Sequence, residues 1–141
     1  MVDYAHNTAG LKALGKFISK VESPRKIGVV AGVGDRRDED TISLGMEAAH
    51  LFDEIVIRQD RNLRGKSGQE IIDLITKGIH SVDPNKKVTP IPNEIEAINY
   101  VIDSASKDSF IVICSDVVPD ALEMIINMKA EEDTKTAGIS F

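Results

Sequence analysis

Residues 27–52 read IGVVAGVGDRRDEDTISLGMEAAHLF. The stretch begins with an almost unbroken apolar run, Ile27–Ala31, passes through Gly32 and Gly34 into a charged turn, and ends in a helical pattern over Thr41–Phe52. Continuous Ile and Val, rather than alternating apolar and polar residues, are typical of a parallel strand that is covered on both faces. The stretch therefore predicts a strand–turn–helix unit of an α/β protein.

The same alternation of a buried run and a helical pattern continues on both sides of this unit. Further strands are predicted at Met1–Tyr4, Glu54–Arg58, Lys87–Ile91 and Phe110–Cys114. Further helices are predicted at Ala9–Val21, Ser67–His80, Glu94–Ser104 and Asp120–Met128. This order predicts an α/β, Rossmann-like fold, in which a doubly wound and mostly parallel sheet of five or six strands has helices on both faces.

The organisation of the chain is expected to be simple. We assign residues 1–130 to one domain and expect residues 131–141 to form a polar tail or a short edge strand. Because Met1 already lies inside the first predicted strand, we also expect the chain to be a piece of a longer protein.

The composition excludes several classes of protein. The 141 residues are 42% hydrophobic and carry a net charge of −6, which suits a globular protein and argues against a nucleic-acid binder. No apolar run could span a membrane and no signal peptide is visible, so we expect a cytoplasmic protein. The single cysteine, Cys114, excludes a disulfide framework and is expected to be a buried apolar residue. No spacing of His, Cys and carboxylates resembles a metal site.

The arginines are unevenly distributed along the chain. Five of the six lie in two short segments, at Arg36 and Arg37 and at Arg58, Arg61 and Arg64. Both segments follow a predicted strand, and in parallel α/β sheets ligands bind beyond the carboxyl ends of the strands. Because guanidinium groups bind carboxylates and phosphates in a bidentate way, we expect an anion to be held there.

Two segments of the sequence match phosphate-binding motifs only in part. Gly32 and Gly34 match the first two glycines of the dinucleotide fingerprint G-x-G-x-x-G, but Arg37 stands at the third. A dinucleotide-binding oxidoreductase remains an alternative, and Arg37 argues against it. Residues 65–67, Gly-Lys-Ser, match the end of a P-loop, but Asp60 stands where the first glycine belongs. We therefore expect no Walker A motif, although Lys66 remains a candidate for binding an anion.

The turn after the first predicted strand carries a carboxylate, an imidazole and an amide. Asp3, His6 and Asn7 have the groups that form hydrogen bonds with a ribose or a base. The same residues also fit a turn in which Thr8 caps the following helix and the polar side chains satisfy local backbone groups. Both interpretations remain open from the residues alone.

DYAHN at residues 3–7 and VVAGVGDRRD at residues 29–38 resemble the C-terminal domain of the Mur ligases, the ATP-dependent amide-bond ligases of the peptidoglycan and folylpolyglutamate group. Their combination with R-x-D-x-x-L-R-G-K at residues 58–66 is most similar to the Mur-ligase-like C-terminal part of cyanophycin synthetases. The resemblance covers nearly the whole chain. It departs at Thr8, where the family usually has proline, and both residues suit the start of a helix.

The resemblance implies a ligase that uses ATP to convert a carboxylate into an acyl phosphate, which an amine then attacks with loss of phosphate. In cyanophycin synthetases the amine belongs to arginine, and the carboxylate belongs to a side chain of an acidic polymer, poly-aspartate. ATP and Mg²⁺ would be bound mainly by a central ATP-binding domain of a homo-oligomeric parent enzyme. We expect this domain to be inactive alone.

The resemblance also implies roles for single residues. Asp3, His6 and Asn7 would bind the nucleotide, and Arg36 and Arg37 would be the catalytic residues facing the cleft. The residues that would bind the amino acid and the acidic polymer are Arg58, Asp60, Arg61, Arg64 and Lys66.

An arginine substrate adds one requirement, because its guanidinium needs a carboxylate partner. The candidates at the predicted strand ends are Asp35, Asp60 and Asp116, of which we favour Asp60. A free-standing nucleotide- or anion-binding module without a ligase partner remains the alternative to the ligase hypothesis.

Overall fold

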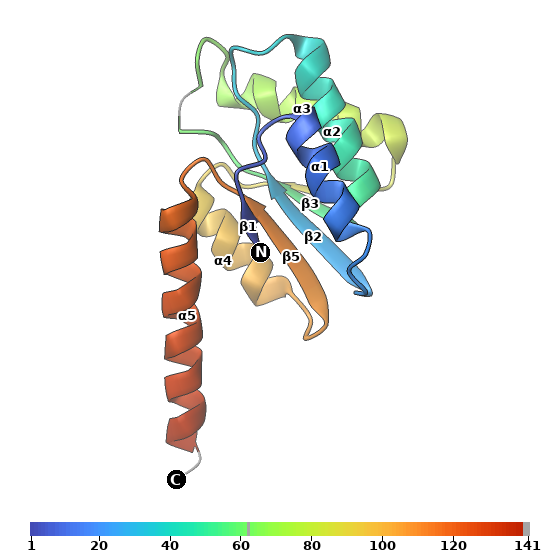
Figure 1. Ribbon diagram of the computed structural model, residues 1–141. Coiled ribbons are helices and arrows are strands. Elements are labelled where there is room, and N and C mark those ends of the chain that lie inside the picture. The colour runs from blue at the N-terminus through green and yellow to red at the C-terminus, as the bar shows by residue number, and fades with distance from the viewer. Residues whose placement is uncertain (62, 140–141) are drawn as a thin grey trace.

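The computed structural model, which describes residues 1–61 and 63–139, shows a five-stranded sheet between two layers of helices (Figure 1). The strands are β1 (Val2–Asp3), β2 (Arg25–Val30), β3 (Glu54–Ile57), β4 (Lys87–Pro90) and β5 (Ser109–Cys114). The helices are α1 (Thr8–Ile18), α2 (Asp38–Leu51), α3 (Gly68–Val82), α4 (Glu94–Ser104) and α5 (Val118–Ile139). Each predicted strand and helix is present, and the α/β, Rossmann-like prediction is confirmed.

The order of the strands brings the ends of four of them together. The sheet is parallel throughout, with the order β1-β5-β2-β3-β4. The chain moves outward from β2 to β4, and α4 then carries it back, so that β5 is inserted between β1 and β2. Asp3 is in register with Cys114, and Val30 with Ile57. The turns after β1, β5, β2 and β3 therefore leave from the same edge of the sheet.

Both faces of the sheet are covered, as continuous Ile/Val strands require. Helices α1, α2 and α3 lie on one face, and α4 and α5 lie on the other (Figure 1). Successive side chains of a strand point to opposite faces. Val30 and Ile57 accordingly pack in the core beneath α1–α3, whereas Val29 and Val56 pack beneath α4 and α5. Burial of one such side chain stabilises the fold by about 1.5–3 kcal/mol.

The starts of three helices show which side chains cap them. Ser67 and Glu70 form the reciprocal bonds of a capping box at α3. Asn93 caps α4, where its side chain accepts a hydrogen bond from the Glu96 backbone N–H at 3.0 Å. At α1 the prediction was wrong by one residue, because the N-cap is Asn7 and Thr8 is the first residue inside the helix.

The last helix is longer than predicted. We expected it to end at Met128, but α5 continues to Ile139 and projects past the edge of the sheet (Figure 1). Residues 131–139 thus continue α5 and form no edge strand, while the proposed domain limit at residue 130 stays a prediction. These residues form no apolar stripe, and fewer than half of them are strong helix formers, so the sequence contained no signal for a helix here. In the described part of the chain, no helix is long and apolar enough to cross a membrane.

An ion-pair cluster joins the amino ends of β2, β3 and β4, at the opposite end of the sheet from the arginine segments. Arg25 Nε donates to Glu54 Oε1 at 2.7 Å, and Lys87 Nζ lies 3.3 Å from Glu54 Oε2. The hydrogen bond from Arg25 is the main reason why the pKa of the Glu54 carboxyl lies below its usual value. The sixth arginine is therefore structural.

Replacing Glu54 with Gln is expected to lower the free energy of unfolding at pH 7. A carboxyl whose pKa is lowered in the folded state stabilises above its unfolded pKa of about 4.3, and this contribution is lost as the pH falls through the folded value. The difference between wild type and variant should therefore shrink as the pH falls below about 4.3. Urea unfolding at several pH values measures it, with the exposed Glu123→Gln as control. A difference independent of pH would show that the ion pairs contribute nothing.

Candidate functional site

Two adjoining cavities open where the four turns meet. The larger cleft, of about 290 Å³, lies between the turns after β1 and β2, and its lining includes His6, Asn7, Gly32, Arg36, Asp40 and Thr41. The smaller pocket, of about 170 Å³, is lined from all four turns, and its ionisable side chains are Tyr4, His6, Asp35, Arg36, Asp60, Arg64 and Asp116. His6 and Arg36 line both cavities. The predicted convergence of the strand ends is therefore present.

The turn after β1 is held by its own polar side chains. Asp3 Oδ1 accepts the Ala5 backbone N–H at 2.9 Å, and Asn7 Oδ1 accepts the Gly10 backbone N–H at 2.7 Å. These bonds support the capping interpretation for Asp3 and Asn7. His6 differs, since only one ring nitrogen, Nδ1, is engaged, 3.0 Å from the Tyr4 carbonyl oxygen. His6 also lines both cavities, and its ring packs against that of Tyr4 with 4.8 Å between the ring centroids.

The two glycines after β2 are explained by packing within the protein. A Cβ at Gly34 would overlap the carbonyl oxygen of Leu63, and one at Gly32 would crowd the side chain of Ile71. The space that a dinucleotide fingerprint leaves for a pyrophosphate is thus filled at Gly34 by the turn after β3. This arrangement removes the structural basis of the oxidoreductase alternative.

The neighbouring arginines Arg36 and Arg37 point to different places. Arg37 is the N-cap residue of α2, and its Nε and Nη2 atoms both donate to the Asp40 carboxylate at 3.1 Å. Arg37 lines neither cavity. Arg36 lines both, and its guanidinium makes no hydrogen bond or ion pair with any residue that the structure describes. Of the two predicted catalytic residues, only Arg36 is available to a ligand in the cleft.

The turn after β3 is fastened to the turn after β2. Lys66 Nζ donates to the carbonyl oxygen of Arg36 and lies 3.2 Å from Asp38 Oδ1. Arg64, which has a positive φ of 45°, donates from Nη1 to Asp35 Oδ2 at 3.1 Å. The hydrogen bond from Arg64 lowers the pKa of the Asp35 carboxyl. Lys66 thus supports the loop that carries Arg36, and its contact with substrate stays a prediction.

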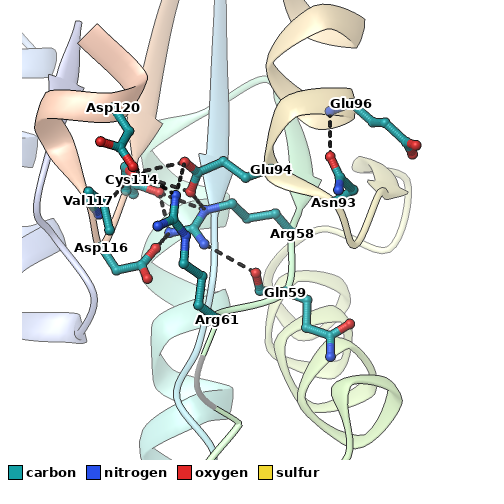
Figure 2. A network of polar contacts seen from close by, with 11 residues as sticks. Arg58, Gln59, Arg61, Asn93, Glu94, Glu96, Cys114, Asp116, Val117 and Asp120 are labelled. Carbon is teal, nitrogen blue, oxygen red and sulfur yellow. Dashed lines mark hydrogen bonds and ion pairs between the residues drawn. The ribbon is translucent and has the colours of Figure 1, made fainter. Parts of the chain in front are cut away.

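Arg58 is the centre of a buried polar network (Figure 2). Its residue is only 3% exposed, and its Nε and Nη2 atoms donate to the Cys114 carbonyl oxygen at 3.1 and 3.0 Å. Nη1 donates to the Gln59 carbonyl oxygen at 3.2 Å. Ion pairs join Nε to Glu94 at 3.3 Å and Nη2 to Asp116 at 3.0 Å. Arg58 therefore connects the turns after β3, β4 and β5, and its burial argues against the predicted contact with substrate.

The network extends to the surface through Arg61. Its Nη2 atom lies 3.3 Å from Asp120 Oδ2 and 4.0 Å from Glu94 Oε1, and its side chain is 55% exposed (Figure 2). Ser115 Oγ, which is buried, donates to the Glu94 carboxylate at 3.2 Å. Asp60 lies at the rim between the smaller pocket and a groove beside α4. Arg61 and Asp60 therefore remain accessible to a ligand.

Glu94 is the site residue that sequence reasoning missed. It is the first residue of α4, where an acidic side chain is expected simply because it suits the helix dipole. That expectation hides its role as a partner of Arg58, since only the strand order shows that the start of α4 lies beside the ends of β3 and β5. The sequence did contain one signal for this role, since Glu94 is an acidic residue that follows the end of β4 by four positions.

Cys114 is buried, as the sequence predicted. Cys114 is 2% exposed, and burial raises the pKa of its thiol to about 12, with the nearby Asp3 charge adding to the rise. The thiol is therefore protonated at neutral pH and is not a nucleophile. Among residues 1–61 and 63–139, no group of three His, Cys, Asp or Glu side chains could hold a metal ion.

Comparison with protein families places this chain in a known family. The sequence pattern of the family described as the Mur ligase, glutamate ligase domain, matches residues 1–117. The match includes all five strands and the four turns that build the cavities, and it ends at the start of α5.

Individual relatives are also similar to this chain. Cyanophycin synthetase of Nostoc sp. strain PCC 7120 is 42% identical over 125 residues, which are 89% of this chain and 14% of that protein. The UDP-N-acetylmuramoyl-L-alanyl-D-glutamate–2,6-diaminopimelate ligase of Buchnera aphidicola is 32% identical, over 80% of this chain and 22% of that protein. The structure of Escherichia coli FolC in complex with ADP, at 14% identity, has a TM-score of 0.68 over 92% of this chain and 29% of that one, and so shares the fold. The chain thus spans about a seventh of the cyanophycin synthetase that it matches.

Proposed function

The chain belongs to the Mur ligase family, as its C-terminal glutamate ligase domain, and on this premise we propose that it completes the active site of an ATP-dependent acid–amino acid ligase similar to cyanophycin synthetase. The observation that carries the proposal is the smaller pocket, where side chains from four separate strand ends meet. The residues that line this pocket, of about 170 Å³, include both carboxylates and arginines. Such a site suits a small zwitterionic substrate and a negatively charged reaction centre.

The proposed reaction has two steps. A substrate carboxylate attacks the γ-phosphorus of ATP, so that an acyl phosphate forms and ADP leaves. The amine of the incoming amino acid then attacks the acyl carbon, an amide bond forms, and inorganic phosphate leaves. If the parent enzyme acts as a cyanophycin synthetase, the amine belongs to arginine and the carboxylate to a side chain of poly-aspartate.

Arg36 is the residue proposed to act on the reacting groups. Its guanidinium has no partner among the described residues and lines both cavities, so it can bind the charge that develops on the acyl phosphate. His6, which lines the same cavities, is proposed to donate or accept a hydrogen bond at the nucleotide side. Asp60 and Arg64 line the smaller pocket, and Asp60 and Arg61 line the groove beside α4. These three residues are proposed to bind the acidic polymer and the amino acid.

The nucleotide and its metal ion require a partner. The described residues include neither a complete P-loop nor a group of metal ligands, so Mg²⁺ does not fit this domain by itself. The central ATP-binding domain of the parent enzyme is proposed to hold ATP and Mg²⁺, with Asp3, His6 and Asn7 at the nucleotide side of the closed cleft. The parent enzyme is proposed to be a cytoplasmic homo-oligomer.

A domain exchange tests this function. In the Nostoc cyanophycin synthetase, the matching 125-residue segment is replaced by this chain, and the fusion is given ATP, an aspartate-polymer primer and L-arginine. We expect arginine-dependent release of phosphate and a primer whose mass grows by arginine. The same enzyme lacking the segment is the control and should be inactive. A folded fusion without arginine-dependent product would refute the proposal.

A further inference from the structure

The polar network around Arg58 contains one negative charge too many. Its two guanidinium groups, Arg58 and Arg61, face three carboxylates, Glu94, Asp116 and Asp120. Arg61 pairs with Asp120 and approaches Glu94, while Arg58 lies between Glu94 and Asp116 (Figure 2). Because a partly buried charge is costly unless it is fully compensated, this surplus calls for an external cation.

Asp116 is the carboxylate at which the surplus is located. Glu94 has two cationic neighbours and a hydrogen bond from Ser115, whereas Asp116 has one cationic neighbour. Its Oδ1 atom is fully buried 3.0 Å from Arg58 Nη2, yet no donor in the described ranges directs a hydrogen at it. The side chain is 21% exposed, and it lines the smaller pocket. A ligand in that pocket can therefore reach the exposed part of the Asp116 side chain, whose buried Oδ1 atom faces Arg58.

The other charges of the pocket narrow the choice of ligand. Asp35 is paired with Arg64, which leaves the Arg36 guanidinium as the free cation of the described lining. An unpaired guanidinium and an undercompensated carboxylate on one small pocket fit a molecule that carries both signs of charge. A metal ion is disfavoured, since the described residues place no three suitable ligands together. The small volume, about 170 Å³, suits a ligand of the size of a single amino acid.

We propose that Asp116 is the specificity-determining residue for the incoming amino acid, whose cationic side chain it binds, and that Arg58 is the positioning residue that holds Asp116 toward the pocket. This inference rests on the proposed function and deepens it. It also replaces Asp60, the carboxylate that the sequence favoured, with a carboxylate whose orientation is set by a buried partner. The substrate class is an amino acid with a guanidinium or ammonium side chain.

The test uses ¹⁵N–¹H NMR titration of the 141-residue chain with L-arginine and with L-citrulline, which has nearly the same shape and no side-chain charge. We expect L-arginine to shift the amide signals of the turn after β5, and L-citrulline to leave them unchanged. Asp116→Asn should weaken arginine binding about tenfold or more, because a charge-assisted hydrogen bond is lost. Asp120→Asn is the matched control, since it belongs to the same network but does not line the pocket, and it should weaken binding less than about twofold.

A conservative variant separates positioning from folding. Arg58→Lys keeps the charge but cannot make both bonds to the Cys114 carbonyl and the ion pair to Asp116, so it should keep a folded spectrum and bind arginine several-fold more weakly. Equal binding of L-citrulline, unchanged binding by Asp116→Asn, or no arginine-induced shifts in the wild-type chain would each overturn the proposal. Suppose that the domain-exchange enzyme is active and that Asp116→Asn leaves its KM for arginine unchanged. This result would refute the role of Asp116 and leave the proposed ligase function intact. If instead the exchange enzyme is inactive but the domain binds arginine in a way that depends on Asp116, the proposed ligase function is refuted and the role of Asp116 stands.

Discussion

Replacing Arg58 with Met is expected to lower the free energy of unfolding by about 3–5 kcal/mol, the cost of leaving a buried ion pair with one partner removed. The guanidinium is almost completely buried and is the nearest compensating charge for both Glu94 and Asp116. Without it, these carboxylates and the Cys114 carbonyl oxygen face an apolar side chain. Urea unfolding at pH 7, followed by far-UV circular dichroism, measures the loss.

Two further variants show whether unpaired charge is the cause. Arg61→Met removes an arginine of the same network that is 55% exposed, and it should cost at most about 1 kcal/mol. Combining Arg58→Met with Glu94→Gln and Asp116→Asn should recover part of the lost stability, because no buried carboxylate then remains unpaired. If Arg58→Met and Arg61→Met had equal effects, the buried network would not be what holds the three turns together.

Replacing Arg36 with Ala is expected to lower kcat of the domain-exchange enzyme about 100-fold or more, the usual effect of removing one group that stabilises charge in a transition state. The loss should fall on kcat more than on the KM for ATP, since the nucleotide is proposed to be held mainly by the central domain. The melting temperature should stay unchanged, because the guanidinium has no partner among the described residues. Steady-state kinetics together with a thermal melt measures both.

Arg37→Ala is the matched control for this result. The two residues are adjacent, carry the same charge and lie in the same turn, but Arg37 pairs with Asp40 and lines neither cavity. We expect its removal to change kcat by less than about threefold, because an exposed ion pair contributes little to the structure of the turn. Equal losses for the two variants would assign catalysis to the overall charge of the turn and not to the position of Arg36.

Much of the fold was predictable because the physical signals were local. The Ile/Val runs of β2 and β5 indicated strands buried on both faces, and the spacing of Ile71, Ile75 and Ile79 indicated the buried stripe of α3. The second half of α5 had no such signal. It has no apolar stripe, so the pattern suggested a tail where the structure has helix.

The site was predictable in outline and not in detail. That the arginine segments would meet at one edge followed from the parallel sheet alone. The direction of each side chain did not, because it depends on where helices begin and which turns touch. Helix α2 starts at Asp38, three residues earlier than expected, which makes Arg37 the N-cap and brings it to Asp40. Arg58 is buried by Glu94 and Asp116, and only the strand order brings these two carboxylates to it.

The central claim is that this domain completes a ligase in which a carboxylate is activated as an acyl phosphate, and oxygen transfer tests it most directly. The domain-exchange enzyme is given a primer whose side-chain carboxylates are labelled with ¹⁸O, together with ATP and L-arginine. Because the acyl–oxygen bond breaks when the amine attacks, one labelled oxygen should appear in inorganic phosphate for each amide bond formed, as measured by mass spectrometry. Amide formation with unlabelled phosphate, or hydrolysis of ATP without amide product, would contradict the account.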